Sequence, residues 1–267
     1  MSNTKDCLLK VTDLNIEFHD HIIPETVVYD FDLELREGEI VGLVGESGSG
    51  KSMSALAIAG LLDRKNMKKR GKIEYDGVDL LTCGRDKLRS YQGNDIGMIF
   101  QEPLTSLNPV YRIYEQVEEP LRIHTNLTKE ERYARVKKAL EDVELEEPEF
   151  VMKQYPHELS GGMRQRVMIA TAMITEPKIL IADEPTTALD VTIQSQIVNV
   201  LKKLNREHGT AIIFISHDLS LVRKLCERVL VMKGGYIVET GLTEEIFCNP
   251  REDYTQRLIS AIPKIEF

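Results

Sequence analysis

The sequence predicts an α/β fold, and three observations support this prediction. Short apolar runs recur at 40–44, 179–182 and 211–215, as is typical of buried strands. Segments with helical spacing of apolar residues separate these runs. The segment GESGSGKS at 45–52 lies between an apolar run and an Ala- and Leu-rich stretch, which is the order strand, loop and helix. With 267 residues, the chain is long enough to bury such a core.

Composition narrows the possible partners and location. The formal net charge of -9 argues against a nucleic-acid partner, which would require a basic face. No stretch approaches the roughly 20 consecutive apolar residues of a membrane-spanning helix, and the first ten residues do not resemble a signal peptide. We therefore expect a cytosolic chain, or one that reaches a membrane only through partner proteins.

The first part of the chain predicts antiparallel strands. Apolar and polar residues alternate at 14–18 and at 31–35, and a Glu-Gly turn signal follows at 37–38. Phe18 ends the first of these strands. It is either an aromatic that stacks on a purine base or a core residue.

The glycine-rich segment predicts a phosphate-binding loop. Glycines allow a tight turn that points successive backbone N–H groups at an anion, and the following helix N-terminus adds to this field. Lys51 is expected to reach the β- and γ-phosphates, and the Ser52 hydroxyl to hold Mg²⁺. We expect the nucleotide to be bound by the residues Gly45, Ser47, Gly48, Ser49, Gly50, Lys51 and Ser52. The segment therefore predicts a nucleoside triphosphate site.

A charged run, a strand and a polar amide follow the predicted helix. The run at 64–70 is interpreted as a solvated loop, and residues 72–77 as a strand and turn. Residues 96–100 read as a buried strand that ends directly before Gln101. Ligands of open α/β sheets bind just beyond strand ends, so Gln101 is a candidate contact of the metal ion or of water.

Residues between Gln101 and Ser160 predict a helical module inserted into the core. In 129–145 the apolar residues recur at spacings of three and four, and Thr128 with Glu131 forms a predicted capping box. The segment LSGGM at 159–163 again places glycines before a helix. It predicts a second anion-binding helix N-terminus, available to a different nucleotide.

Acidic residues follow the next apolar run, ILIADEP at 179–185. Asp183 is placed at the carboxyl end of a buried strand, as a Mg²⁺-supporting carboxylate of a P-loop site would be. Glu184 is expected to polarise the attacking water.

Three further segments complete the chain. Residues 191–205 have helical spacing, and residues 228–239 read as a closing hairpin. Between them, His217 follows the strand at 211–215, where it can donate a hydrogen bond to the γ-phosphate.

Together these motifs resemble those of an ATP-binding cassette (ABC) ATPase. They occur in the family's order: GESGSGKS at 45–52, Gln101, LSGGM at 159–163, ILIADEP at 179–185, ALD at 188–190 and His217. The runs YPHELSGGMRQRVMIA at 155–170 and IADEPTTALDVTIQSQI at 181–197 are similar to its peptide and nickel importer branch. The tail, with Asn-Pro at 249–250 and YTQRLISAIP at 254–263, is similar to the C-terminal motif of that branch.

The resemblance implies a role for each matching residue. Phe18 would stack on adenine, Glu184 would be the catalytic carboxylate and His217 the switch histidine. Gln101 would contact Mg²⁺ and water, and Asp183 would hold Mg²⁺ through water. The trans ATP site of a partner subunit would be completed by Ser160, Gly161, Gly162 and the D-loop residue Asp190 across a head-to-tail dimer.

The resemblance also implies a domain plan. A single ATPase domain over 1–246 would contain a core with its antiparallel β subdomain (1–100 and 168–246) and a helical subdomain (101–167). A short tail, 247–267, would follow.

The implied cofactors are ATP and Mg²⁺. The implied partners are a related second ATPase subunit, in a heterodimer or alternatively a homodimer, two membrane permease subunits and an extracytoplasmic solute-binding protein. The implied location is the cytoplasmic face of the membrane.

The cargo would be a dipeptide or oligopeptide, with nickel or a metal chelate as the alternative. A more remote alternative is a soluble cassette ATPase without a transport role. Met163 stands where many cassettes have glutamine, although this branch often has methionine there. The cysteine-rich extension of longer branch members does not occur in these 267 residues, which favours dipeptides, nickel or a chelate over oligopeptides.

Overall fold

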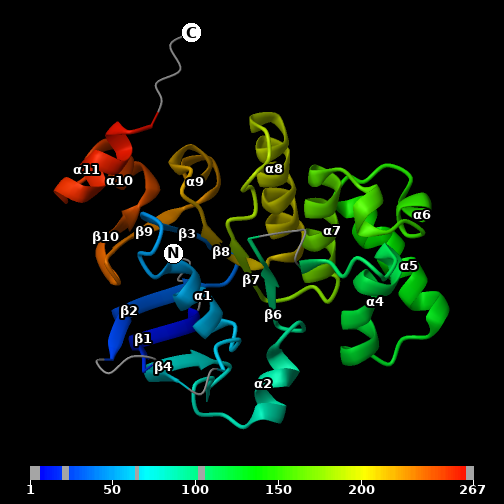
Figure 1. Cartoon of the computed structure of the whole chain (residues 1–267), viewed down its shortest axis with the longest axis horizontal. Coiled ribbons are helices and arrows are strands. Elements are labelled where there is room, and N and C mark those ends of the chain that lie inside the picture. Colours follow the sequence, from blue (N-terminus) through cyan, green and yellow to red (C-terminus); the bar gives the residue numbers. More distant parts are fainter. Residues whose placement is uncertain (1–6, 20–23, 64–65, 102–105, 263–267) are drawn as a thin grey trace, which may run out of the picture. The chain divides into compact units, whose positions relative to one another are not determined.

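The structure is a computed structural model that describes residues 7–19, 24–63, 66–101 and 106–262 (Figure 1). The chain divides into two compact units. The first comprises Met1–Leu88 and Ala211–Phe267, and the second comprises Arg89–Thr210. Helix α2 (Arg85–Tyr91) lies where the first unit passes into the second.

An antiparallel sheet of order β2-β1-β4-β5 forms one layer of the first unit. Its strands are β1 (Cys7–Phe18), β2 (Glu25–Arg36), β4 (Met67–Tyr75) and β5 (Val78–Asp79). The apolar residues Leu9, Val11, Leu14 and Ile16 of β1 are buried, whereas its polar residues are partly or fully exposed. The antiparallel strands predicted at 14–18 and 31–35 are confirmed.

The expectation of a loop at 64–70 is wrong for residues 67–70, and residues 64–65 lie outside the described part. Residues 67–70 form the first half of β4 and pair with β1, with Met67 opposite Phe18 and Arg70 opposite Asn15. A charged strand is stable here because its side chains face solvent and opposite charge, as in the Arg70–Glu17 pair at 3.8 Å. The charge run therefore identified a solvated face, not a loop.

Parallel strands form the other layer of the first unit, in the order β10-β9-β3-β8. The parallel strands are β3 (Ile40–Val44), β8 (Ala211–Ile215) and β9 (Arg228–Lys233), and β10 (Tyr236–Leu242) is antiparallel to β9. Every residue of β3 and β8 is buried, as in a sheet covered on both faces. The predicted closing hairpin is confirmed as β9–β10.

Four helices accompany these strands: α1 (Lys51–Ile58), α9 (Leu219–Leu225), α10 (Thr243–Cys248) and α11 (Asp253–Ser260). Parallel strands present their carboxyl ends at one edge. The loop after β3 and the turn after β8 therefore lie at the same edge of this sheet.

In the second unit, β6 (Ile96–Ile99) pairs with β7 (Ile179–Asp183) in parallel, and helices make up most of its other described residues. Its helices are α4 (Ile113–His124), α5 (Lys129–Asp142), α6 (Pro148–Val151), a 3₁₀ turn (Pro156–Glu158), α7 (Gly161–Met173) and α8 (Val191–His208). Helices α4, α5 and α7 pack on one another (Figure 1). None of the helices in the described ranges is long and apolar enough to cross a membrane.

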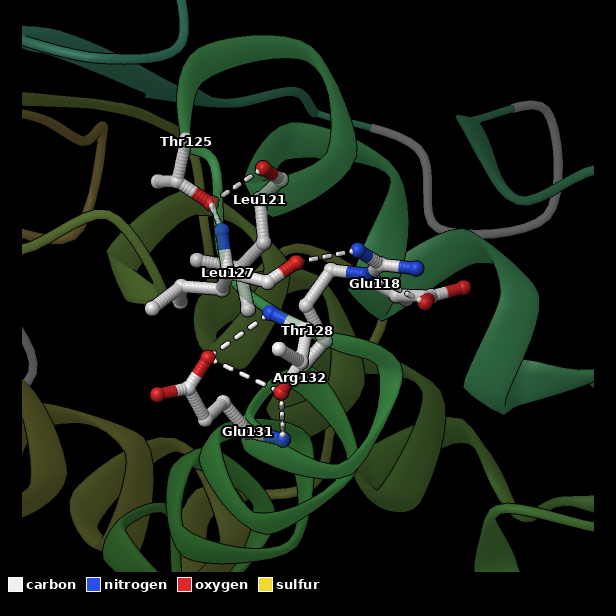
Figure 2. A network of polar contacts seen from close by, with 7 residues as sticks. All are labelled: Glu118, Leu121, Thr125, Leu127, Thr128, Glu131 and Arg132. Atoms are coloured by element: carbon white, nitrogen blue, oxygen red, sulfur yellow. Dashed lines mark hydrogen bonds and ion pairs between the residues drawn. The ribbon is translucent and has the colours of Figure 1, made fainter.

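The connection from α4 to α5 contains the predicted capping box (Figure 2). The Thr128 hydroxyl accepts the Glu131 N–H at 3.3 Å, and the Glu131 carboxylate accepts the Thr128 N–H at 2.7 Å. Arg132, one residue later, donates from Nε to Glu118 of α4 at 2.6 Å and from Nη1 to the Leu127 carbonyl. The capping box thus satisfies backbone groups at the start of α5, and the ion pair ties the first turn of α5 to α4.

Candidate active site

The loop between β3 and α1 has the backbone that only glycine adopts easily. Gly45, Gly48 and Gly50 have φ values of 149°, 79° and 101°. A Cβ on Gly45 would lie 2.1 Å from the Met232 carbonyl oxygen, and one on Gly50 would lie 2.9 Å from that of Val27. Of the other predicted loop residues, Ser49 is buried and Ser47 is exposed. The loop therefore turns tightly against β2 and β9.

The start of α1 fits a bound anion. Gly50 occupies the N-cap position and supplies no side chain, so no cap competes for the first N–H groups of the helix. Lys51 is only 5% exposed, and its Nζ donates to the carbonyls of Gly45 at 2.9 Å and Glu46 at 2.7 Å. Ser52 follows in the first turn and is partly exposed. An ammonium, a hydroxyl and backbone donors are the groups that a polyphosphate with Mg²⁺ needs.

The turn of the β9–β10 hairpin contacts this loop. The Gly235 N–H donates to the Ser49 carbonyl at 3.1 Å, and the Tyr29 N–H donates to the Gly235 carbonyl at 2.9 Å. The rings of Tyr29 and Tyr236 stack with centroids 4.4 Å apart. The Gly235 N–H thus holds the loop at Ser49, and the bond from Tyr29 ties the hairpin turn to β2.

Two other predicted site residues belong to the same unit. His217 is exposed directly after β8, in a turn held by the Asp218 N–H, which donates to the Ser216 hydroxyl at 3.0 Å. Asp218 in turn caps α9 by accepting the Ser220 N–H at 2.8 Å. Phe18 is the last residue of β1, partly buried, opposite Glu25 of β2. The ring therefore retains an exposed part.

In the second unit, the acidic pair lies at the end of β7. Asp183 is the last residue of the strand and is 5% exposed. Glu184 is partly buried and has φ 47°, a region that favours glycine. One oxygen of its carboxylate, Oε2, accepts the Gln101 side-chain amide at 3.1 Å and the Thr187 hydroxyl at 2.8 Å. Two donors thus fix the orientation of Glu184.

The segment LSGGM at 159–163 and the segment ALD at 188–190 are neighbours in the second unit. Ser160 caps α7 by accepting the Met163 N–H at 3.3 Å, and Asp190 caps α8 by accepting the Ile193 N–H at 2.9 Å. A Cβ on Gly162 would come within 3.0 Å of Ile193, and one on Gly161 within 3.6 Å of Leu189. The absence of side chains at both glycines lets the start of α7 approach Leu189 and the start of α8.

Comparisons with known proteins identify the family. A family model described as ABC transporter matches residues 28–187. The chain belongs to the ABC transporter family. This ABC cassette has α/β architecture with an antiparallel sheet, which confirms the fold class predicted from the sequence. Its cofactors are ATP and Mg²⁺, and the donor groups around Lys51 and Ser52 are of the kind that bind them.

Curated relatives of this ABC cassette span nearly its whole length. It is 50% identical over 97% of its residues to the peptidoglycan transport ATP-binding protein YejF of Agrobacterium fabrum, of which it covers 48%. It is 46% identical over 98% of its residues to the oligopeptide transport ATP-binding protein OppD of Escherichia coli, of which it covers 77%. The chain therefore spans about half of one relative and three quarters of the other.

Solved structures are similar as well. A dimeric post-hydrolysis state of the ATP-binding cassette MJ0796 with ADP and Pi superimposes with a TM-score of 0.79 at 31% identity. The match covers 88% of this chain and 98% of that one.

Sequence reasoning did not assign two residues that contact the predicted site. Thr187 donates a hydrogen bond to Glu184. The sequence indicates this contact only in that Thr187 follows Glu184 by three residues in the same motif. Tyr254 bonds to the loop residue Glu46, and its only signal was the C-terminal motif.

Proposed function

We propose that this ABC cassette is the ATP-hydrolysing subunit of an importer of short peptides. The observation that carries the ATPase role is the Glu184 carboxylate, held by Gln101 and Thr187 directly after the buried Asp183. A fixed carboxylate at a strand end is suited to take a proton from an attacking water.

The resemblance to ABC ATPases suggests the roles of the remaining residues, and their chemistry suits these roles. The loop 45–50 and Lys51 bind the phosphates, Phe18 stacks on the adenine, and His217 donates a hydrogen bond to the γ-phosphate. Mg²⁺ would neutralise phosphate charge, and the oxygen donors of Ser52, Gln101 and Asp183 would hold it, Asp183 through water. Ser160, Gly161 and Gly162, with Asp190, would complete the ATP site of a partner subunit.

The peptide cargo is supported by the names of the relatives. OppD is named for oligopeptide transport, and relatives at 45–46% identity are named for dipeptide transport and for glutathione import. We therefore infer that the ATPase acts at the cytoplasmic face of a membrane with two permease subunits and a solute-binding protein. Its dimer partner is a related second ATPase chain.

Replacing Glu184 with glutamine tests the ATPase role. Glu184→Gln keeps the size of the side chain but removes the base, so we expect turnover to fall by at least about 100-fold. MgATP affinity should stay within about twofold of the unchanged chain, and ATP should trap a dimer that gel filtration detects. The matched control is Glu37→Gln, an exposed turn residue that should leave turnover unchanged. Loss of ATP binding in Glu184→Gln would contradict the role as general base.

A further inference from the structure

The C-terminal helix α11 reaches back to the phosphate-binding loop. The Tyr254 hydroxyl oxygen accepts a hydrogen bond from the Glu46 backbone N–H at 3.0 Å. Tyr254 is 8% exposed, so its ring is packed and its hydroxyl is held in place. Burial raises the pKa of Tyr254, so the phenol is neutral at physiological pH.

The position of Tyr254 is fixed by the strands that also support the loop. Lys233, the last residue of β9, places its Nζ 4.9 Å from the centre of the Tyr254 ring. Glu239 of β10 accepts the backbone N–H groups of Arg251 at 2.8 Å and Glu252 at 3.2 Å, directly before α11. The start of α11 is therefore anchored to the β9–β10 hairpin.

The same peptide group is held from both sides. The N–H that Tyr254 binds and the carbonyl that Lys51 binds at 2.9 Å both belong to the peptide between Gly45 and Glu46. In a planar trans peptide the C=O and N–H point in opposite directions. Tyr254 and Lys51 therefore hold opposite edges of one plane. If the Tyr254 bond is lost, the plane can rotate and carry the carbonyl away from Lys51.

We propose that Tyr254 is a positioning residue of the nucleotide site, which sets the orientation of the Gly45–Glu46 peptide and through it the position of Lys51. This role rests on the proposed use of the loop for ATP. It gives the C-terminal motif a part in ATP binding, although the motif lies 208 positions from the loop.

The test compares two tyrosines of the first unit. Tyr254→Phe removes only the hydroxyl and keeps the packed ring. Tyr236→Phe is the matched control, because the Tyr236 hydroxyl makes no hydrogen bond within the described residues. A phenylalanine ring there would keep the stacking on Tyr29. We expect Tyr254→Phe to weaken binding of AMP-PNP with Mg²⁺ by about three- to tenfold in calorimetry, the effect of one neutral hydrogen bond. The thermal midpoint should stay within about 2 °C of the control.

A second measurement distinguishes a role of Tyr254 in orienting the Gly45–Glu46 peptide from a role in anchoring helix α11. Amide exchange at Glu46 should accelerate in Tyr254→Phe and not in Tyr236→Phe. Glu239→Gln loosens the start of α11 but keeps the Tyr254 hydroxyl, so it should lower stability with a smaller loss of affinity.

Three outcomes would be decisive against these proposals. Unchanged AMP-PNP affinity in Tyr254→Phe would overturn the positioning role. A loss of affinity in Glu239→Gln as large as that in Tyr254→Phe would also overturn it. Absence of AMP-PNP binding by the unchanged chain would instead contradict the proposed ATP site.

Discussion

Glu184 has a backbone conformation that is uncommon for a residue other than glycine. Its φ of 47° places an acidic side chain in a backbone region that most residues avoid, which costs on the order of 1 kcal/mol or more. The hydrogen bonds from Gln101 and Thr187 to its carboxylate keep the side chain in one orientation. In the proposed reaction, this orientation determines where the attacking water stands.

Thr187 provides the residue-scale prediction. Thr187→Val keeps the shape and removes the donor, so the Glu184 carboxylate loses the hydrogen bond from this hydroxyl. We expect kcat for ATP hydrolysis to fall about tenfold, about 1.4 kcal/mol of transition-state free energy, with KM within about twofold. Thr187→Ser restores the donor and should restore kcat. Equal rates for the valine and serine variants would contradict the role of this hydroxyl.

At the scale of elements, the α4–α5 corner depends on a largely buried ion pair. The side chains of Glu118 and Arg132 are only 11% and 20% exposed, and Arg132 also binds the Leu127 carbonyl (Figure 2). A buried carboxylate without its partner is costly, whereas exposed pairs contribute little. Removing the cation of this pair should therefore lower the free energy of unfolding more than removing the cation of an exposed pair in the same unit.

Arg132→Met tests this difference. Glu118 would remain buried without its cation, so we expect the free energy of unfolding to fall by about 3 kcal/mol in urea denaturation. The matched control is Arg135→Met, because the Arg135–Glu176 pair is 42% and 49% exposed and should contribute at most about 1 kcal/mol. Combining Arg132→Met with Glu118→Leu should recover most of the loss. Equal losses in the two single variants would contradict this account.

Because Glu239 anchors the start of α11 through its carboxylate, we expect the stability of the fold to depend on pH. Burial acts to raise the pKa of Glu239, but hydrogen bonds donated to its carboxylate, among them those from the Arg251 and Glu252 N–H groups, hold the pKa below its ordinary value. A lowered pKa in the folded state adds stability above the unfolded pKa of about 4.3, and this stability is lost as pH falls through the folded pKa.

The stability difference between the unchanged chain and Glu239→Gln should therefore be constant from pH 6 to 8. It should shrink below about pH 4 in urea titrations. A difference that persists undiminished at pH 3 would show that the charge of Glu239 does not matter.

At the scale of the whole molecule, local signals were predictable from the sequence. The phosphate-binding loop, the strand before Asp183 and the capping box at Thr128 each depend on a few consecutive residues, and the structure has them where they were expected. The pairing of residues 67–70 with β1 was missed because charge masks the pattern of a strand. The Tyr254–Glu46 and Glu118–Arg132 contacts were also missed, because only the fold brings such residues together.

The central claim is that this ABC cassette hydrolyses ATP to drive import of short peptides. The most direct measurement is ATP hydrolysis by the chain reconstituted in lipid vesicles with its permease subunits, second ATPase chain and solute-binding protein. The account predicts that dipeptides or short oligopeptides raise the rate several-fold only when the binding protein is present, and that Glu184→Gln abolishes the response. Stimulation by Ni²⁺ instead of peptides would contradict the proposed cargo. A rate indifferent to peptides, Ni²⁺ and membrane partners alike would contradict the import function itself.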